Sequence, residues 1–465
     1  MKRAYKKISI IITQTILVCT LFISCKKQQE WLEIKANLNS VTPERINEFQ
    51  ALLDYDVNFM GKGLLTVISA APYYLTNDQF NAITVGIERN TYTWNKQIYE
   101  GRFASDWEVN YKTIAIANIT LEGILKTAIT PSNKSAYNQV KGTSHYFRAA
   151  GYLNLIQAFS KHYDANTYNT DLGVILQLTP EFNKQPKRAT VKQCYDQIIE
   201  DLTIAATILP NTTDNQIRPS STAAKALLAN VYLLMERWDL AEKFASEALN
   251  NYAVLMDFNI IPITANIPFA TLQNKNPEVI YYAEMSGSSN FVSNGSFIDS
   301  TLYQSYHNND LRKSALFRLF NNRPIFKGFY TGKTATPFGG IATNEIYLIK
   351  AESLARLGDH SSAMNVLNSL LQKRWRNGTF TPLTASNANE ALSKIIEERR
   401  KELPFTGNIA WCDLRRLNKD VRFARTLKRV VLNTVYELAP NSSKYILPIP
   451  DEEIRLTGIP QNIRE

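Results

Sequence analysis

The sequence predicts a mostly α-helical fold of tetratricopeptide-like helical hairpins with a large irregular ligand-binding region that has few short strands. The first observation is a pair of amphipathic helices over 221–249, with apolar residues at i, i+3 and i+4. The second is the recurrence of this pattern without gaps over 343–371, where Ala351 falls on Ala229. The third is a long segment over 251–342, between the two copies, that Pro and Gly interrupt. One hairpin cannot bury its apolar face alone, so two copies predict a stacked core.

The bulk composition limits the function classes. The chain has 465 residues, which is ample for a large core, and a formal net charge of +10. Its basic residues lie among acidic ones, whereas a nucleic-acid-binding protein would gather them on one face. We therefore expect a solvated surface and no nucleic-acid partner.

The first 24 residues predict a signal peptide. A basic start, MKRAYKK, precedes an apolar run that ends Leu-Phe-Ile-Ser before Cys25. This segment resembles a bacterial lipoprotein signal, which implies cleavage before Cys25, lipid attachment there, and a short tether over 25–30. The alternative is a plain secretory signal in which Cys25 is incidental.

The remaining chain, 31–465, divides by its patterns. Residues 31–105 mix short helices with aromatic loops, and helical repeats are expected over about 106–250 and 343–403. The insertion over about 251–342 is long enough to be functional. Thr190 opens a helix with a capping box. The mixed-charge run 397–402 predicts a solvated, ion-paired helix face.

No catalytic or metal-binding pattern is present in the sequence. It has no GxSxG, P-loop or HExxH motif, and its four histidines are scattered, so we predict no enzyme, no cofactor and no metal site. Cys194 is expected to be a small core residue, and the same role is open to Cys412. A Cys194–Cys412 disulfide is left open.

The motifs, taken in order, resemble the SusD/RagB family of Bacteroidota outer-membrane lipoproteins. They follow Cys25 along nearly the whole chain: YKTIAIAN from Tyr111, KGTSHYFRAAGYLNLI from Lys141, YDQIIEDLTIA from Tyr195, the 221–249 hairpin, YLIKAESLARLGD from Tyr347, EERRKELPFTG from Glu397, WCDLRRLN from Trp411, LPIPDEEI from Leu447, and Gln461-Asn462. The resemblance implies a non-catalytic, lipid-anchored protein that faces the cell surface. It also implies capture of oligosaccharide, or of peptide, for a SusC-like TonB-dependent transporter.

A site that binds a ligand without catalysing a reaction must gain its affinity from contacts with that ligand. Flat aromatic rings pack against the apolar faces of sugars, and amide and carboxylate groups pair the hydroxyls. The aromatic loops with neighbouring polar residues supply the candidates, which are Tyr73, Tyr74, Asn77, Asp78, Trp94, Tyr303 and Tyr306. For each ring the alternative is that it fills the core. We hypothesise that Trp94 stacks on the ligand, so that Trp94→Ala weakens binding and leaves the melting temperature nearly unchanged.

Two other functions compete with ligand capture. A helical-repeat scaffold that binds other envelope proteins would use the concave face of the repeats, but has little need of the 251–342 insertion. A secreted hydrolase would need catalytic residues that the sequence does not offer.

Overall fold

The computed structural model describes residues 43–55, 63–101, 104–181, 185–288, 290–291 and 295–465. The signal peptide, Cys25 and the tether lie outside these residues. None of the helices in the described ranges has the length and apolar character that a membrane span requires.

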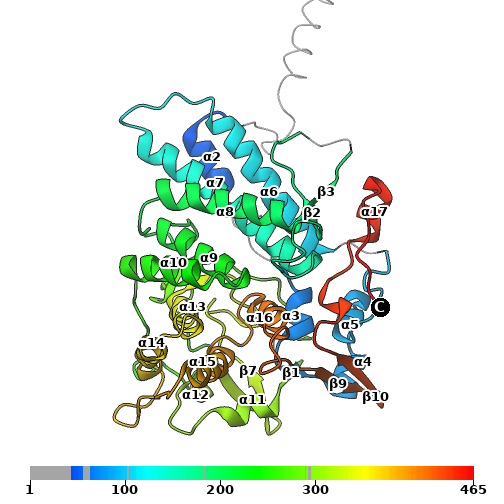
Figure 1. The fold of residues 1–465 in the computed structure, drawn as a ribbon, viewed down its shortest axis with the longest axis vertical. Helices are drawn as coiled ribbons and strands as arrows, with labels where there is room; N and C mark the ends of the chain where they lie inside the picture. The colour runs from blue at the N-terminus through cyan, green and yellow to red at the C-terminus, as the bar shows by residue number, and fades with distance from the viewer. Residues whose placement is uncertain (1–42, 56–62, 102–103, 182–184, 289, 292–294) are drawn as a thin grey trace, which may run out of the picture.

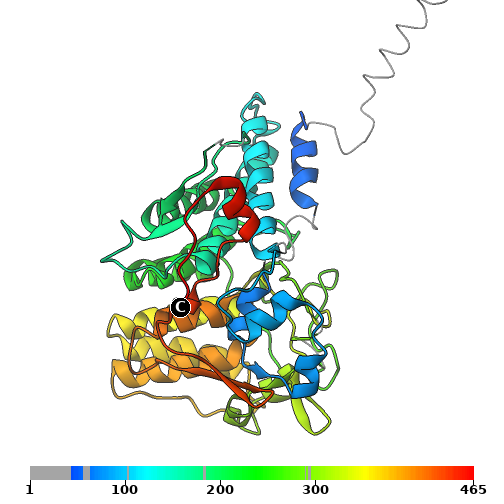
Figure 2. The ribbon, with the colours of Figure 1, turned by 90° about the vertical axis from the view of Figure 1, so that its right-hand side faces the viewer.

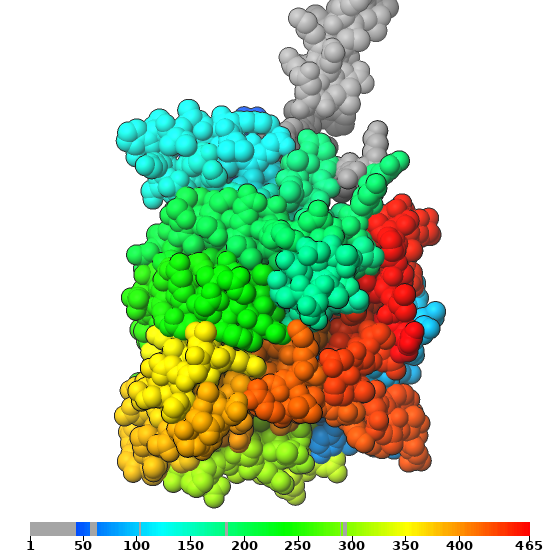
Figure 3. Space-filling model, in the orientation of Figure 1, coloured from blue at the N-terminus to red at the C-terminus, as the bar shows by residue number. Residues whose placement is uncertain are grey.

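Helices in antiparallel pairs form the frame of the molecule. Each helix packs on the next along the chain, and α10 packs directly against α13 across the intervening insertion. Figure 1 shows the resulting stack, and Figure 3 shows it as bands from cyan to orange down the left of the molecule. The helices are α6 (Ser105–Ile124), α7 (Lys134–Phe159), α8 (Val191–Ile208), α9 (Ser221–Leu234), α10 (Trp238–Asn251), α13 (Thr343–Arg356), α14 (His360–Gln372) and α15 (Ala388–Glu402).

The repeat prediction is confirmed at the level of single positions. Helices α9 and α13 begin and end at corresponding residues of the two copies. Both turns contain a residue with positive φ at the same repeat position, Glu236 at 59° and Gly358 at 94°. The aligned Ala229 and Ala351 are both fully buried, which lets neighbouring helices approach closely.

The remaining helices are short and surround this frame. Thr190 caps α8 through the predicted capping box. The short helices are α2 (Ile46–Asp54), α3 (Leu65–Ala70), α4 (Asn77–Asn81), α5 (Gly86–Tyr92), α11 (Ser300–Ser305), α12 (Arg312–Leu316), α16 (Ile409–Leu417) and α17 (Asp451–Thr457).

All strands in the described ranges belong to antiparallel two-stranded sheets. The sheet that bears on the site pairs β1 (Tyr73–Tyr74) with β5 (Phe297–Ile298), with Tyr74 opposite Phe297. The other pairs are β2 (Leu172–Ile175) with β3 (Arg188–Thr190), β4 (Val279–Tyr281) with β8 (Ile341–Ala342), β6 (Phe317–Phe320) with β7 (Arg323–Phe326), and β9 (Leu427–Val431) with β10 (Thr434–Leu438).

The C-terminal tail wraps over the body and also forms a hairpin, β9–β10, that the sequence reading did not foresee. Figure 2 shows the red segment running beside the upper helices. Leu447 N–H donates to the Ala158 carbonyl at 2.8 Å, and the Asn462 amide donates to the Phe159 carbonyl at 2.7 Å. These bonds fasten the tail to the C-terminal end of α7.

The mixed-charge run 397–402 is largely buried, so the predicted solvated face is wrong. Glu398, Arg399, Lys401 and Glu402 are 3–7% exposed. Arg312 from the insertion binds Glu398 at 2.5 Å and Glu402 at 3.1 Å, and Arg374 binds Glu402 at 2.8 Å. A buried charge needs partners of opposite charge. Here those partners come from segments far away in the sequence, which a local charge pattern cannot reveal.

Both cysteines in the described ranges are free and buried. Cys194 lies against Val174, and the Cys412 thiol donates to the Gln157 side-chain oxygen at 3.7 Å. The prediction of a core position is therefore confirmed for Cys194. The disulfide that the sequence left open is not formed in the structure.

Candidate functional site

The structure separates the seven predicted binding residues into a buried group and a surface group. Tyr73, Trp94 and Tyr306 are 5%, 1% and 2% exposed. Tyr74, Asn77 and Asp78 are exposed, and Tyr303 is half-buried. Only the surface group can meet a ligand in this conformation.

Trp94 is a core residue in the structure, which argues against the stacking role hypothesised for it. Its indole Nε1–H donates to the Ser69 carbonyl at 3.1 Å. The Arg429 guanidinium lies 4.3 Å from its ring centroid and 4.1 Å from that of Tyr92. Trp94 also has φ 51°, so the loop turns sharply there and carries the ring inward. The polar loop sequence around it gave no sign of this turn.

Tyr73 and Tyr306 also stabilise the interior. The Tyr73 hydroxyl donates to the Ile68 carbonyl at 2.7 Å, and its ring lies 5.7 Å from that of Phe291. The Tyr306 hydroxyl donates to the Lys401 carbonyl at 2.6 Å. Each buried phenol thus has an acceptor, as an interior Tyr requires.

Tyr74 points outward because side chains alternate along a strand. Its neighbour Tyr73 enters the core, whereas Tyr74 is 37% exposed. Across the sheet, the Phe297 ring lies 5.8 Å from the Tyr74 ring. The Arg323 guanidinium lies 5.1 Å from the Phe297 centroid. Tyr74, Phe297 and Arg323 therefore form a row over β1, β5 and β7.

Asn77 and Asp78 lie at the start of α4, directly after β1. Thr76 caps this helix, with its hydroxyl accepting from Gln79 N–H. The Asn77 side-chain oxygen accepts the Leu432 N–H at 2.8 Å, which ties the turn of the β9–β10 hairpin to the same surface. Asp78 is exposed beside it. The short connection thus brings a carboxylate and an amide close to the exposed tyrosine in sequence.

Tyr303 belongs to α11, which follows β5 after Asp299. Its ring lies 5.6 Å from that of Phe317 on β6, and the Lys313 ammonium lies 5.2 Å from its centroid. Asp299 caps α11 and is itself held by Arg400 at 2.8 Å. Strand β5 therefore connects Tyr303 to the Tyr74 row. We call Tyr74, Asn77, Asp78, Tyr303 and Arg323 the Tyr74 face.

The Tyr74 face can bind but has no arrangement for covalent chemistry. It combines an exposed ring, a guanidinium, an amide and a carboxylate, which suits a ligand with flat apolar faces and hydroxyl groups. Among the described residues, no group of three or more His, Cys, Asp or Glu side chains could hold a metal ion.

Arg323 and Phe297 were missed by the sequence reading. Arg323 follows Asn321-Asn322, both of which have positive φ, at 49° and 59°, in the turn between β6 and β7. Two asparagines between apolar runs are a recognisable hairpin signal, and this one could have placed Arg323 at the start of a strand. Phe297 carries no such signal.

Comparison with known families gives two matches. Residues 30–233 match a SusD-like family described as "Starch-binding associating with outer membrane", and residues 333–463 match the SusD family. The SusD-like protein P2 of Formosa agariphila is 25% identical in an alignment that covers 76% of this chain and 78% of that protein.

Solved structures show the same fold. A putative sugar-binding protein of Bacteroides vulgatus has a TM-score of 0.72 at 20% identity, covering 91% of this chain and 99% of that one. A SusD superfamily protein of Bacteroides thetaiotaomicron has a TM-score of 0.72 at 21% identity, covering 90% and 100%. A laminarin-binding SusD-like protein has a TM-score of 0.66 at 19% identity, covering 90% and 98%.

Proposed function

Because this chain belongs to the SusD/RagB family, we propose that it is an outer-membrane lipoprotein that captures a glycan on the Tyr74 face. The SusD family comprises binding proteins and not enzymes. Glycan is preferred over peptide as the ligand because the structural relatives include one named for laminarin binding and one named as a surface glycan-binding protein. The lipid anchor at Cys25, the cell-surface orientation and a SusC-like TonB-dependent transporter as partner belong to the same proposal.

The observation that supports the Tyr74 face is the exposure of the Tyr74 ring in line with Arg323. Tyr74 is the member of the Tyr73–Tyr74 pair that does not fill the core. Its ring offers a surface for a sugar face, and Asn77 and Asp78 lie three and four residues further along the chain. A glycan would gain stacking from the ring and hydrogen bonds from the polar groups, with no part of the core disturbed.

Calorimetry of the purified protein against a panel of polysaccharides, oligosaccharides and peptides tests this proposal. Tyr74→Ala and Arg323→Ala should each weaken glycan binding roughly tenfold, with the stability nearly unchanged because both side chains are exposed. Tyr55→Ala is the matched control, because Tyr55 is 58% exposed at the end of α2. Binding that is confined to peptides would redirect the proposal, and no binding of any small ligand would favour the envelope scaffold.

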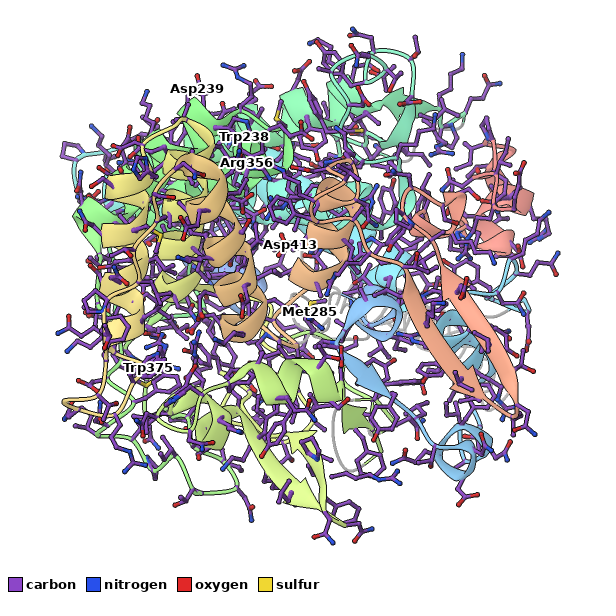
Figure 4. The ribbon with its side chains drawn as sticks, turned by 60° about the horizontal axis from the view of Figure 1, so that its bottom comes forward. Trp238, Asp239, Met285, Arg356, Trp375 and Asp413 are labelled. Carbon is purple, nitrogen blue, oxygen red and sulfur yellow. The ribbon has the colours of Figure 1, made fainter. Side chains whose placement is uncertain are left out.

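Binding of the proposed transporter partner can be tested by substitutions on the exposed surface of the helical repeats and the loop after α16. At the hairpin turns, Leu357 is 52% exposed and Val421 in the loop after α16 is 90% exposed. Beside them the Arg356 guanidinium lies 4.6 Å from the Trp238 ring centroid. Both residues are labelled in Figure 4. Trp and Arg among exposed apolar residues are common at protein interfaces. Val421→Asp should reduce co-purification of a TonB-dependent transporter from native membranes, whereas Tyr74→Ala should not.

A further inference from the structure

A second surface aromatic pair lies outside the Tyr74 face. The rings of His307 and Trp375 stack with centroids 5.1 Å apart and an interplanar angle of 17°. Trp375 is half-buried and also contacts Phe380, at 5.9 Å between ring centroids. His307 is exposed, so its ring forms the outer layer of the stack. Contact with Phe380 covers one part of Trp375, and the His307 ring covers another.

The pair is separated from Tyr74 itself. Trp375 lies three residues beyond the C-terminal end of α14, and in Figure 4 it lies at the lower left, while β1 and the β9–β10 hairpin lie toward the right. One sugar ring cannot contact both Tyr74 and Trp375. A long chain of linked units could.

The loop that carries Trp375 is held rigidly on two sides. Toward the 307–311 segment, Leu311 N–H donates to the Arg374 carbonyl at 2.8 Å and Arg376 N–H donates to the Asn309 carbonyl at 2.9 Å. Toward the other side, the Asn259 amide donates to the Trp375 carbonyl at 2.9 Å. A preformed surface loses little conformational entropy on binding, so even a shallow contact retains most of its gain.

Polar side chains that make no hydrogen bond to another described residue lie next to the two stacked residues in the sequence. His307 Nδ1 accepts the Asn309 N–H at 3.1 Å, so in the neutral ring the proton lies on Nε2, which remains available as a donor. The side chains of Asn309, Arg376 and Asn377 make no hydrogen bond to any other residue that the structure describes. These groups offer donors and acceptors next to flat rings, the combination that recognises a polyhydroxylated ring.

We infer that the His307–Trp375 stack is a second sugar-binding site that contacts a further unit of the same glycan chain. This inference rests on the proposed function, because it takes the ligand to be a glycan. The His307 ring would pack against the apolar face of one pyranose, and the neighbouring amides would pair its hydroxyls. When one part of a polysaccharide is bound at the Tyr74 face, the rest of the same glycan is held close to the second site at a high effective concentration. A polysaccharide that reaches both sites therefore gains affinity that a short oligosaccharide cannot gain.

The test compares a long polysaccharide with a short oligosaccharide of the same glycan, by calorimetry on the purified protein. His307→Ala and Asn377→Ala both alter exposed side chains. Each should weaken polysaccharide binding by roughly tenfold or more and leave the oligosaccharide affinity at the Tyr74 face unchanged. His360→Ala is the matched control, since His360 starts α14 at the opposite end of the helix from Trp375. It should change neither affinity.

The outcomes separate this inference from the proposed function. Unchanged or stronger polysaccharide binding by His307→Ala overturns the second site and leaves the Tyr74 face intact. Equal losses for the long and the short glycan also overturn it, because they indicate one shared site. If the wild-type protein binds no glycan of either length, the proposed function itself fails. A Trp375→Phe variant, which keeps a ring beneath His307, should retain most of the polysaccharide affinity.

Discussion

Trp94→Ala decides whether the aromatic segment before α6 belongs to the core or to the ligand site. The substitution removes a side chain that is 1% exposed and has the Arg429 guanidinium 4.3 Å from its ring. Truncating a buried Trp to Ala costs about 3–5 kcal/mol, and losing the cation–π contact adds roughly 1 kcal/mol. The Ser69 carbonyl still accepts from Arg429 at 3.0 Å, so no buried acceptor is orphaned. The expected loss of unfolding free energy is therefore about 4–6 kcal/mol.

Thermal unfolding and glycan calorimetry together measure this effect. Unfolding entropy is about 2 cal/mol/K per residue, so for roughly 400 folded residues a loss of about 4–6 kcal/mol lowers Tm by about 5–7 °C. Trp94→Phe keeps an aromatic ring beside Arg429 and should lose about half as much. Both variants should bind glycan at 20 °C with nearly wild-type affinity.

The opposite pattern would refute the assignment of Trp94 to the core. If Trp94→Ala kept Tm within about 1 °C of the wild type and lost glycan affinity, its ring would have to leave the interior to meet the ligand. Tyr74→Ala serves as the reference for a ligand contact, since it should lose affinity and keep Tm. The two substitutions should therefore give reversed results in the two assays.

Three further predictions concern the frame. Burial raises the pKa of Asp106 to about 6, so the folded state holds an extra proton between about pH 4 and pH 6 and stability falls as the pH rises through that window. Asp106→Asn should remove this fall, on the order of 2–3 kcal/mol, in urea unfolding measured from pH 4 to pH 7. Burial also raises the pKa of the Cys194 thiol to about 11 and that of Cys412 to about 12, so a thiol reagent at pH 8 should label neither cysteine until urea is added. Gly358→Ala should lower the free energy of unfolding by about 1–2 kcal/mol, because a side chain is strained at a φ of 94°. Glu236→Gly at the corresponding turn should raise the free energy of unfolding, because glycine removes that strain. If both substitutions changed the free energy of chemical unfolding in the same direction, the two turns would not be equivalent.

The repeat frame could be predicted because its signals are local. The apolar spacing, the buried Ala229 and Ala351 and the Thr190 capping box are all read within one or two helical turns. The burial of 397–402 could not be predicted in this way. Its charges are balanced by Arg312 from the insertion and by Arg374 after α14, and nothing in the spacing of a helix reveals partners that come from other segments.

The candidate site was predictable as a region but not as a set of side chains. The segment from Tyr73 to Trp94 does reach the surface, yet Tyr74 is exposed where Tyr73 and Trp94 are buried. A two-residue strand is too short to show an alternating pattern in sequence. Which of the two tyrosines turns outward depends on its pairing with Phe297 from the insertion, more than two hundred residues away.

The contacts that the family motifs make explain why these motifs identify the fold but not the ligand. Arg148 binds Asp201 through two hydrogen bonds at 2.7 and 2.8 Å, and the Trp411 indole donates to the Gln157 carbonyl at 2.9 Å. These side chains are at most 8% exposed and join helices to one another. An unpaired polar group inside a protein is costly, so such contacts constrain the sequence strongly wherever the fold is kept. In the Tyr74 face, Tyr74, Asp78 and Arg323 are exposed and carry no such constraint. Their side chains are free to differ between proteins of one fold, which is where differences in the captured ligand should arise.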